Sequence, residues 1–178
     1  MSTETLPRTL DVRKAAVRGL HLSGTLDPVD LPRFRPLLAA DRGSVAVALV
    51  FSRDEENRYL VRVSLTADVT VLCQRCLQPM PLGLSATGTL AAVWTDEQAA
   101  HLPRHLDPLI ADTQDCNLWH LAEDELILAM PAFSYHDTED CKQRMTDFTD
   151  PPPEQVEDTE ETPNPFKVLA QLKPGNEH

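Results

Sequence analysis

Alternating apolar and polar residues mark the middle of the chain as a long β-hairpin. From 59 to 71, apolar residues occupy every second position, and mostly polar residues lie between them. A period of two is typical of a strand that has one buried face and one wet face. The alternation stops at 73–81 and resumes over 82–94. The sequence therefore predicts two antiparallel strands joined by a tip of sequence CQRCLQP.

Shorter apolar runs predict further strands on both sides of this hairpin. These runs cover 20–26, 43–52 and 107–113. The run at 43–52 ends in a polar turn, which directs the chain back into the hairpin. We therefore expect at least four strands, in an antiparallel sheet or a partly closed barrel, with helices packed against it. This arrangement belongs to the α+β class.

Helical spacing and capping residues predict helices around the strands. The segment 11–19 offers Leu10, Ala15 and Val17 for burial and ends at a glycine. Asp27 and Pro28 form a cap for a helix over 27–38, although two further prolines interrupt it. The other helices are predicted at 96–102 and 118–130.

The helix predicted over 118–130 begins at the capping residue Asn117 and ends before a proline. Three consecutive acids, Glu123, Asp124 and Glu125, lie within it. Adjacent residues on a helix point about 100° apart and do not converge on one ion. We therefore expect this triplet to face solvent.

The end of the chain differs from the rest in composition. Residues 1–145 are expected to form a single globular domain, and 146–163 an acidic, proline-rich linker. The segment 146–162 carries seven acids and no bases, a composition typical of disorder. The final part, 164–178, opens with a helix cap and is predicted to be a docking helix and tail. Its apolar residues at helical spacing are Phe166, Leu169 and Leu172.

Charge is distributed unevenly along the chain. The formal net charge is −12, which argues against a protein that grips nucleic acid over its whole surface. Residues 1–80 nevertheless carry 11 Lys and Arg against 9 Asp and Glu. An RNA contact is therefore expected in the first half of the chain; a solvated charged face is the alternative. The candidates for this contact are Arg13, Lys14, Arg18, Arg58, Arg62 and Arg75, with Arg33 and Arg35 as further basic residues.

The chain lacks the patterns of a secreted or membrane protein. Acids interrupt its N-terminus, and its longest apolar run covers only 45–51. We therefore expect a cytoplasmic protein with no membrane partner. In a reducing compartment, its four cysteines are free thiols or metal ligands rather than disulfides.

Four residues have the chemistry of a structural zinc site. Cys73 and Cys76 form a C-x-x-C at the predicted hairpin tip, and His136 and Cys141 supply an H-x4-C. Three thiolates and one imidazole suit tetrahedral zinc. The two pairs lie far apart in sequence, so such a site depends on the tertiary fold. The alternative is that these cysteines are ordinary thiols.

The hypothesis that the protein is an enzyme has little support in the sequence. The chain has no phosphate-binding loop, no dinucleotide fingerprint and no nucleophile elbow. It also lacks the H-x-E and P-C-x-x-C order of a zinc deaminase. A thioredoxin-like role is disfavoured because prolines follow the C-x-x-C and prevent a helix there. We therefore expect a protein that is not an enzyme.

Four separated blocks resemble one protein family. The segments CQRCLQP, AEDELILAMP, HDTEDC and NPFKVLAQLK are similar to the YceD family, described as large ribosomal RNA subunit accumulation proteins. The resemblance implies a role in synthesis, processing or stability of the large-subunit (23S) ribosomal RNA during ribosome biogenesis. The implied partner is this RNA, its precursor or an assembly intermediate, and no DNA. It implies no reaction mechanism.

A second function fits the same sequence. The acids of 146–162 and the helix at Phe166 suit an adaptor that binds a basic ribosomal protein. Direct RNA contact through the basic first half and protein capture by the acidic tail are distinct hypotheses, and the sequence leaves both open. A metal-dependent RNA-processing enzyme is the least supported reading.

Overall fold

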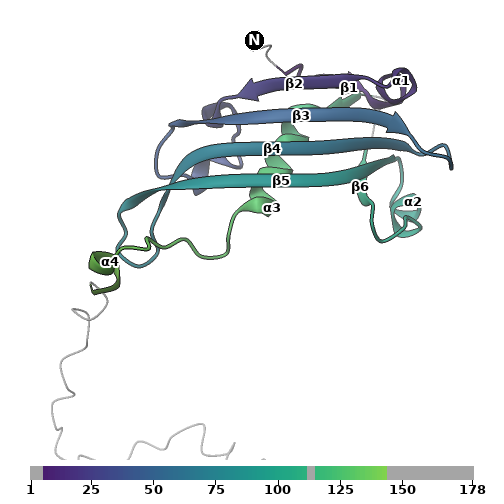
Figure 1. Ribbon diagram of the computed structural model, residues 1–178. Coiled ribbons are helices and arrows are strands. Elements are labelled where there is room, and N and C mark those ends of the chain that lie inside the picture. The colour runs from purple at the N-terminus through teal and green to yellow at the C-terminus, as the bar shows by residue number, and fades with distance from the viewer. Residues whose placement is uncertain (1–5, 112–114, 144–178) are drawn as a thin grey trace, which may run out of the picture.

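The protein is built around an open, twisted sheet (Figure 1). The computed structural model describes residues 6–111 and 115–143. Within them, five strands lie in the order β2-β3-β4-β5-β6. Neighbouring strands are antiparallel except β5 and β6, which run parallel. The strands are β2 (His21–Leu26), β3 (Gly43–Arg53), β4 (Tyr59–Leu72), β5 (Pro79–Val93) and β6 (Asp107–Ile110).

The α+β class is confirmed, and the sheet is open rather than a barrel. Short strands β1 (Thr9–Asp11) and β7 (Asp115–Asn117) pair with each other in a separate ladder that the sequence pattern did not reveal. The linker over 146–163 and the helix predicted at Phe166, Leu169 and Leu172 lie outside the described residues.

The predicted hairpin is confirmed as the longest ladder of the sheet. Strands β4 and β5 pair continuously from Tyr59 opposite Ala92 to Leu72 opposite Pro79. Alternate residues of β4, from Val61 to Val71, are buried, whereas Arg62 and the next three residues of the opposite face are exposed. The hairpin therefore has one core face and one wet face, as its alternation predicts.

Two helices cover the core face of the sheet. Helix α1 (Val12–Arg18) packs on β3 and β4, and α3 (Leu118–Ala129) packs on β5 and β4. Their buried residues join those of β3 and β4 in one apolar core. The remaining described helices are short: α2 (Asp96–Ala100) and α4 (Glu139–Gln143).

Helix α1 has the predicted position but a different buried face. The Asp11 side chain accepts a hydrogen bond from the backbone N–H of Lys14, and Gly19 ends the helix with a φ of 62°. The residues that it buries are Val12, Ala15 and Ala16. Val17 is 61% exposed, so its predicted burial is wrong. At 100° per residue, Val17 points away from the face that Val12 and Ala15 share.

The single helix predicted over 27–38 is also wrong. The segment forms two 3-10 turns instead, η1 (Pro28–Asp30) and η2 (Arg35–Leu37). Pro32 and Pro36 lack the N–H groups that a continuous helix needs. The apolar residues of the segment keep their role, because Leu31 and Phe34 are buried completely or nearly so.

The acidic triplet of α3 does not face solvent as a unit, contrary to the sequence expectation. Glu123 is fully buried. Its Oε1 accepts hydrogen bonds from the backbone N–H groups of Arg33 (2.6 Å) and Phe34 (3.0 Å), and its Oε2 accepts one from Arg33 Nε (3.0 Å). Burial opposes ionisation, but these bonds outweigh it and hold the pKa of Glu123 below its usual value. The carboxylate therefore ties α3 to the segment between η1 and η2.

Replacing this carboxylate is expected to destabilise the fold. Glu123→Gln removes the charge and sets an amide N–H against Arg33 Nε, which costs about 2 kcal/mol at neutral pH. Folding lowers the pKa of Glu123, so its contribution is present above the unfolded pKa and is lost as the pH falls below it. Urea unfolding at several pH values measures both effects.

Asp124→Asn is the matched control for this experiment. Asp124 is the exposed neighbour and pairs only at the surface with Arg33 Nη1 (2.7 Å). An exposed ion pair of this kind is worth at most about 1 kcal/mol. Equal loss of stability in the two variants would contradict the anchoring role of Glu123.

Candidate metal centre

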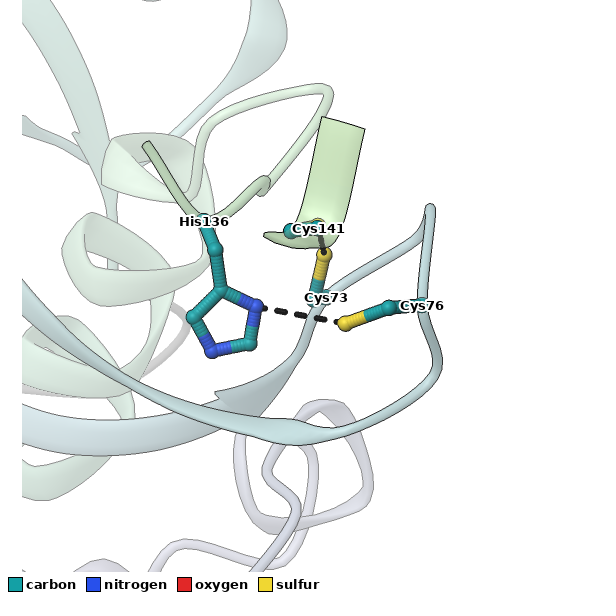
Figure 2. A group of neighbouring side chains, drawn as sticks. All are labelled: Cys73, Cys76, His136 and Cys141. Carbon is teal, nitrogen blue, oxygen red and sulfur yellow. Dashed lines mark hydrogen bonds between the residues drawn. The ribbon is translucent and has the colours of Figure 1, made fainter. Parts of the chain in front are cut away.

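Four side chains from three parts of the chain converge beyond the end of the hairpin (Figure 2). Cys73 follows β4, Cys76 lies in the tip, His136 lies in the segment after α3, and Cys141 belongs to α4. One sulfur or ring nitrogen from each lies within 4.8 Å of all the others. Cys73 Sγ is 3.5 Å from Cys141 Sγ, and Cys76 Sγ is 3.3 Å from His136 Nδ1. The structure thus brings together all four residues predicted as ligands.

The tip folds tightly enough to turn both of its cysteines inward. The backbone N–H of Cys73 donates to the carbonyl of Gln78, and that of Leu77 donates to the carbonyl of Cys73, each at 2.9 Å. Leu77 adopts a φ of 57°, a left-handed conformation that residues with a side chain seldom occupy. The backbone of the tip is therefore held in a specific shape.

Backbone hydrogen bonding fastens the segment after α3 to this tip. The N–H of Gln74 donates to the carbonyl of Ser134 at 2.9 Å. His136 follows two residues later, and the first turn of α4 then carries Cys141 inward. This contact closes the long gap in sequence between the two pairs of ligands.

The electrostatics of the site favour a bound cation. Burial opposes ionisation of Cys73, but backbone N–H groups of Cys76, His136 and Arg75 outweigh it and lower its pKa to about 5. The pKa of Cys141 is raised by burial and by Cys73 and Cys76 beside it. A divalent cation would relieve this repulsion between sulfur atoms. Among the described residues, no other group of three or more His, Cys, Asp or Glu side chains has this convergence.

The basic residues predicted to contact RNA divide between the two ends of the sheet. Helix α1 carries Arg13, Lys14 and Arg18, whereas Arg58 and Arg62 lie at the start of β4. Arg75 lies in the tip, beyond the other end of that strand. The 14 residues of β4 span about 45 Å at roughly 3.3 Å each. These residues therefore do not form one compact patch.

Two of these basic residues are paired with acids. Lys14 Nζ lies 2.9 Å from Asp11, and Arg58 contacts Asp54 at 2.6 Å and Glu56 at 2.9 Å. Such surface pairs are weak and can exchange for a phosphate. These ion pairs lower the net positive charge around Lys14 and Arg58, but the N–H groups of both side chains remain able to bind a phosphate.

Sequence reasoning missed two contacts between arginines and aromatic rings, one made by Arg13 of the predicted set and one by Arg53, which was not predicted. The Arg13 guanidinium lies 3.9 Å from the ring centroid of Trp94, and Arg53 lies 5.4 Å from that of Tyr59. The two rings meet edge to face at 5.9 Å. We call these four residues the arginine–aromatic cluster. The sequence offered one signal for this cluster: Tyr59 begins the first hairpin strand and Trp94 follows the second, so the two aromatic residues lie at the same end of the hairpin.

These features define a small α+β protein whose longest hairpin ends at a Cys3His group that could hold a metal ion. No helix in the described ranges is long and apolar enough to cross a membrane. The model of the YceD family, described as large ribosomal RNA subunit accumulation protein YceD, matches residues 61–173. The chain belongs to this family.

A curated relative supports the same assignment. The chain is 32% identical over 174 residues to the large ribosomal RNA subunit accumulation protein YceD of Haemophilus influenzae, with 94% of this chain and 96% of the relative covered. No solved structure matches the chain.

Cobalt binding tests the geometry of the centre. We expect Co²⁺ added to the reduced, metal-free protein to give thiolate charge-transfer and tetrahedral d–d absorption, because the site offers three sulfurs and one imidazole. Cys76→Ser should lose part of the sulfur-to-metal intensity. Cys116→Ser is the control, since Cys116 is a buried thiol outside the site. Identical spectra for Cys76→Ser and the unmodified protein would contradict the assignment.

Proposed function

We propose that the protein is a non-enzymatic factor in the synthesis, processing or stability of 23S ribosomal RNA during ribosome biogenesis. Family membership, with a relative named for large ribosomal RNA subunit accumulation, is the observation that carries this proposal. The ligand of the protein is the large-subunit RNA or its precursor, alone or within an assembly intermediate. Its role is to bind, with no chemical step.

The α1 end of the sheet is the proposed main RNA contact. Lys14 and Arg18 are exposed there, and the arginine–aromatic cluster lies on the same helix and the adjacent strand ends. Cations supply attraction to phosphates, and cation–π pairs hold the arginine side chains in place. A few exposed cations on one helix of an acidic protein suit selective contact with RNA, because the overall charge of −12 opposes indiscriminate binding.

The metal centre is proposed to hold one structural zinc ion. Three cysteines and one histidine complete a tetrahedral shell, which leaves no open position for a reacting water. Zinc bound there would clamp α4 and the segment before it against the hairpin tip. Its role is therefore to order this part of the surface.

Zinc removal tests the clamp directly. Purified reduced protein is expected to contain one zinc ion per chain. Chelation should lower the melting temperature and increase amide hydrogen exchange at the tip and at 131–143, because the bound ion stabilises the folded tip. Exchange in the centres of β3 and β4 should change little. Unchanged exchange at the tip after complete metal removal would contradict a structural role.

RNA binding is expected to be strongly salt-dependent. The double variant Lys14→Glu/Arg18→Glu should bind a labelled 23S fragment at least about tenfold more weakly at moderate salt, with a smaller salt slope by roughly one per lost phosphate contact. Fluorescence anisotropy over a salt series measures both quantities. Lys14 and Arg18 are chosen because neither side chain lies over a ring of the arginine–aromatic cluster, whose contacts the double variant therefore leaves in place.

Arg35→Glu/Arg42→Glu is the charge-matched control. Both residues are exposed, and they flank Ala39, whose N–H donates to the carbonyl of Thr70 near the tip end of β4. Equal loss of binding in both double variants would contradict a contact localised at α1. Absence of RNA binding at every salt concentration would favour the adaptor hypothesis.

A further inference from the structure

Two exposed aromatic rings lie next to the metal centre. Phe133 and Tyr135 stack with their ring planes 5° apart and their centroids 6.2 Å apart. Their exposed fractions are 68% and 44%, which is high for large aromatic side chains. Both belong to the segment between α3 and α4. The rings therefore present flat apolar surface to solvent rather than to the core.

An arginine completes this arrangement. Arg75 lies between the two tip cysteines, and its guanidinium carbon is 4.8 Å from the ring centroid of Tyr135. Its Nη1 is buried and has no hydrogen-bond partner in the structure. An unmatched donor of this kind is costly, and an oxygen from a ligand would satisfy it after a small shift of the side chain. We call Arg75, Phe133 and Tyr135 the tip platform.

The metal centre and one hydrogen bond fix the tip platform in place. Cys73 and Cys76 flank Arg75, and His136 follows Tyr135 directly. Ser134, between the two aromatic residues, is the residue whose carbonyl accepts from Gln74. Rings held in this way lose little conformational entropy when a ligand covers them. The platform is therefore preorganised for stacking.

We propose that the tip platform binds an unpaired RNA base, which stacks on the exposed ring of Phe133. The choice of RNA as ligand rests on the proposed function. Aromatic rings and arginine planes are the usual surfaces for splayed bases in single-stranded RNA, since every base has a π-face. A parallel pair of rings next to a guanidinium matches this chemistry.

The charges around the platform specify the mode of binding. Asp137 lies in the same segment, Glu139 and Asp140 open α4, and all three are exposed. Lys142 is paired with Glu139 at 2.7 Å. These acids repel phosphates, so base stacking rather than backbone attraction provides the affinity. Binding at the platform should therefore depend weakly on salt and discriminate against duplex RNA, whose bases are already stacked.

A short oligonucleotide tests this proposal on the full-length, metal-loaded protein. The probe is a labelled oligouridylate of about eight nucleotides, a typical length for one single-strand site. Phe133→Ala should weaken its binding roughly 5- to 150-fold, which corresponds to the loss of one base–aromatic stack. The salt dependence of oligouridylate binding should be the same in Phe133→Ala as in the unmodified protein. Phe133→Trp should retain binding, and the fluorescence of its new indole should be quenched by the probe.

Leu128→Ala is the matched control, because Leu128 is an exposed apolar residue (80%) on α3 outside the platform. Metal content should be equal in all variants, which excludes loss of the clamp as the cause. Unchanged oligouridylate affinity in Phe133→Ala would overturn the proposal. Equal affinity for a duplex RNA would also overturn it. The proposal would likewise be wrong if Phe133→Ala kept its affinity for RNA but lost binding to a ribosomal protein.

The experiment separates this proposal from the proposed function. If the 23S fragment binds through Lys14 and Arg18 but Phe133→Ala has no effect on either RNA, the platform proposal is wrong and the proposed function stands. If neither RNA binds to the unmodified protein, the platform proposal and the direct RNA contact at α1 are both wrong, and the adaptor hypothesis is favoured.

Discussion

The continuous pairing of β4 with β5 is the constraint on which the rest of the structure depends. Its ladder runs without a break from Tyr59 to Leu72, and it carries the hairpin tip to one end of the sheet (Figure 1). The same ladder places Tyr59 at the other end, where it meets Trp94. The two chemically distinct ends of the protein are therefore set by one strand pair.

Two tertiary contacts then decide where the second half of the chain lies. Glu123 fixes α3 on the core through the backbone of Arg33 and Phe34. The Gln74–Ser134 hydrogen bond fixes the following segment on the tip. These contacts help to bring His136 and Cys141 close to Cys73 and Cys76. The Glu123 carboxylate and the Cys3His group are alike in one respect. Each brings together polar groups from segments that are distant in sequence.

The two proposed RNA contacts differ in kind and lie at opposite ends of the sheet. Exposed cations near α1 provide attraction that depends on ionic strength, whereas the tip offers stacking surface with acids around it. A protein with a net charge of −12 can bind RNA in this way, because each contact is local. The proposed metal centre would matter for the second kind alone, since a bound ion would order the tip.

The sequence by itself determined the strands of the main sheet, the hairpin with its C-x-x-C tip, the glycine that ends α1 and the cap of α3, because alternation and capping are local properties of the chain. It also nominated all four candidate metal ligands, from residue chemistry and short spacings. Tertiary structure alone decided that Glu123 is buried, that Val17 is exposed, and that Phe133 and Tyr135 stack beside Arg75. These outcomes depend on donors and rings contributed by distant segments, and no local pattern records which segment will lie opposite.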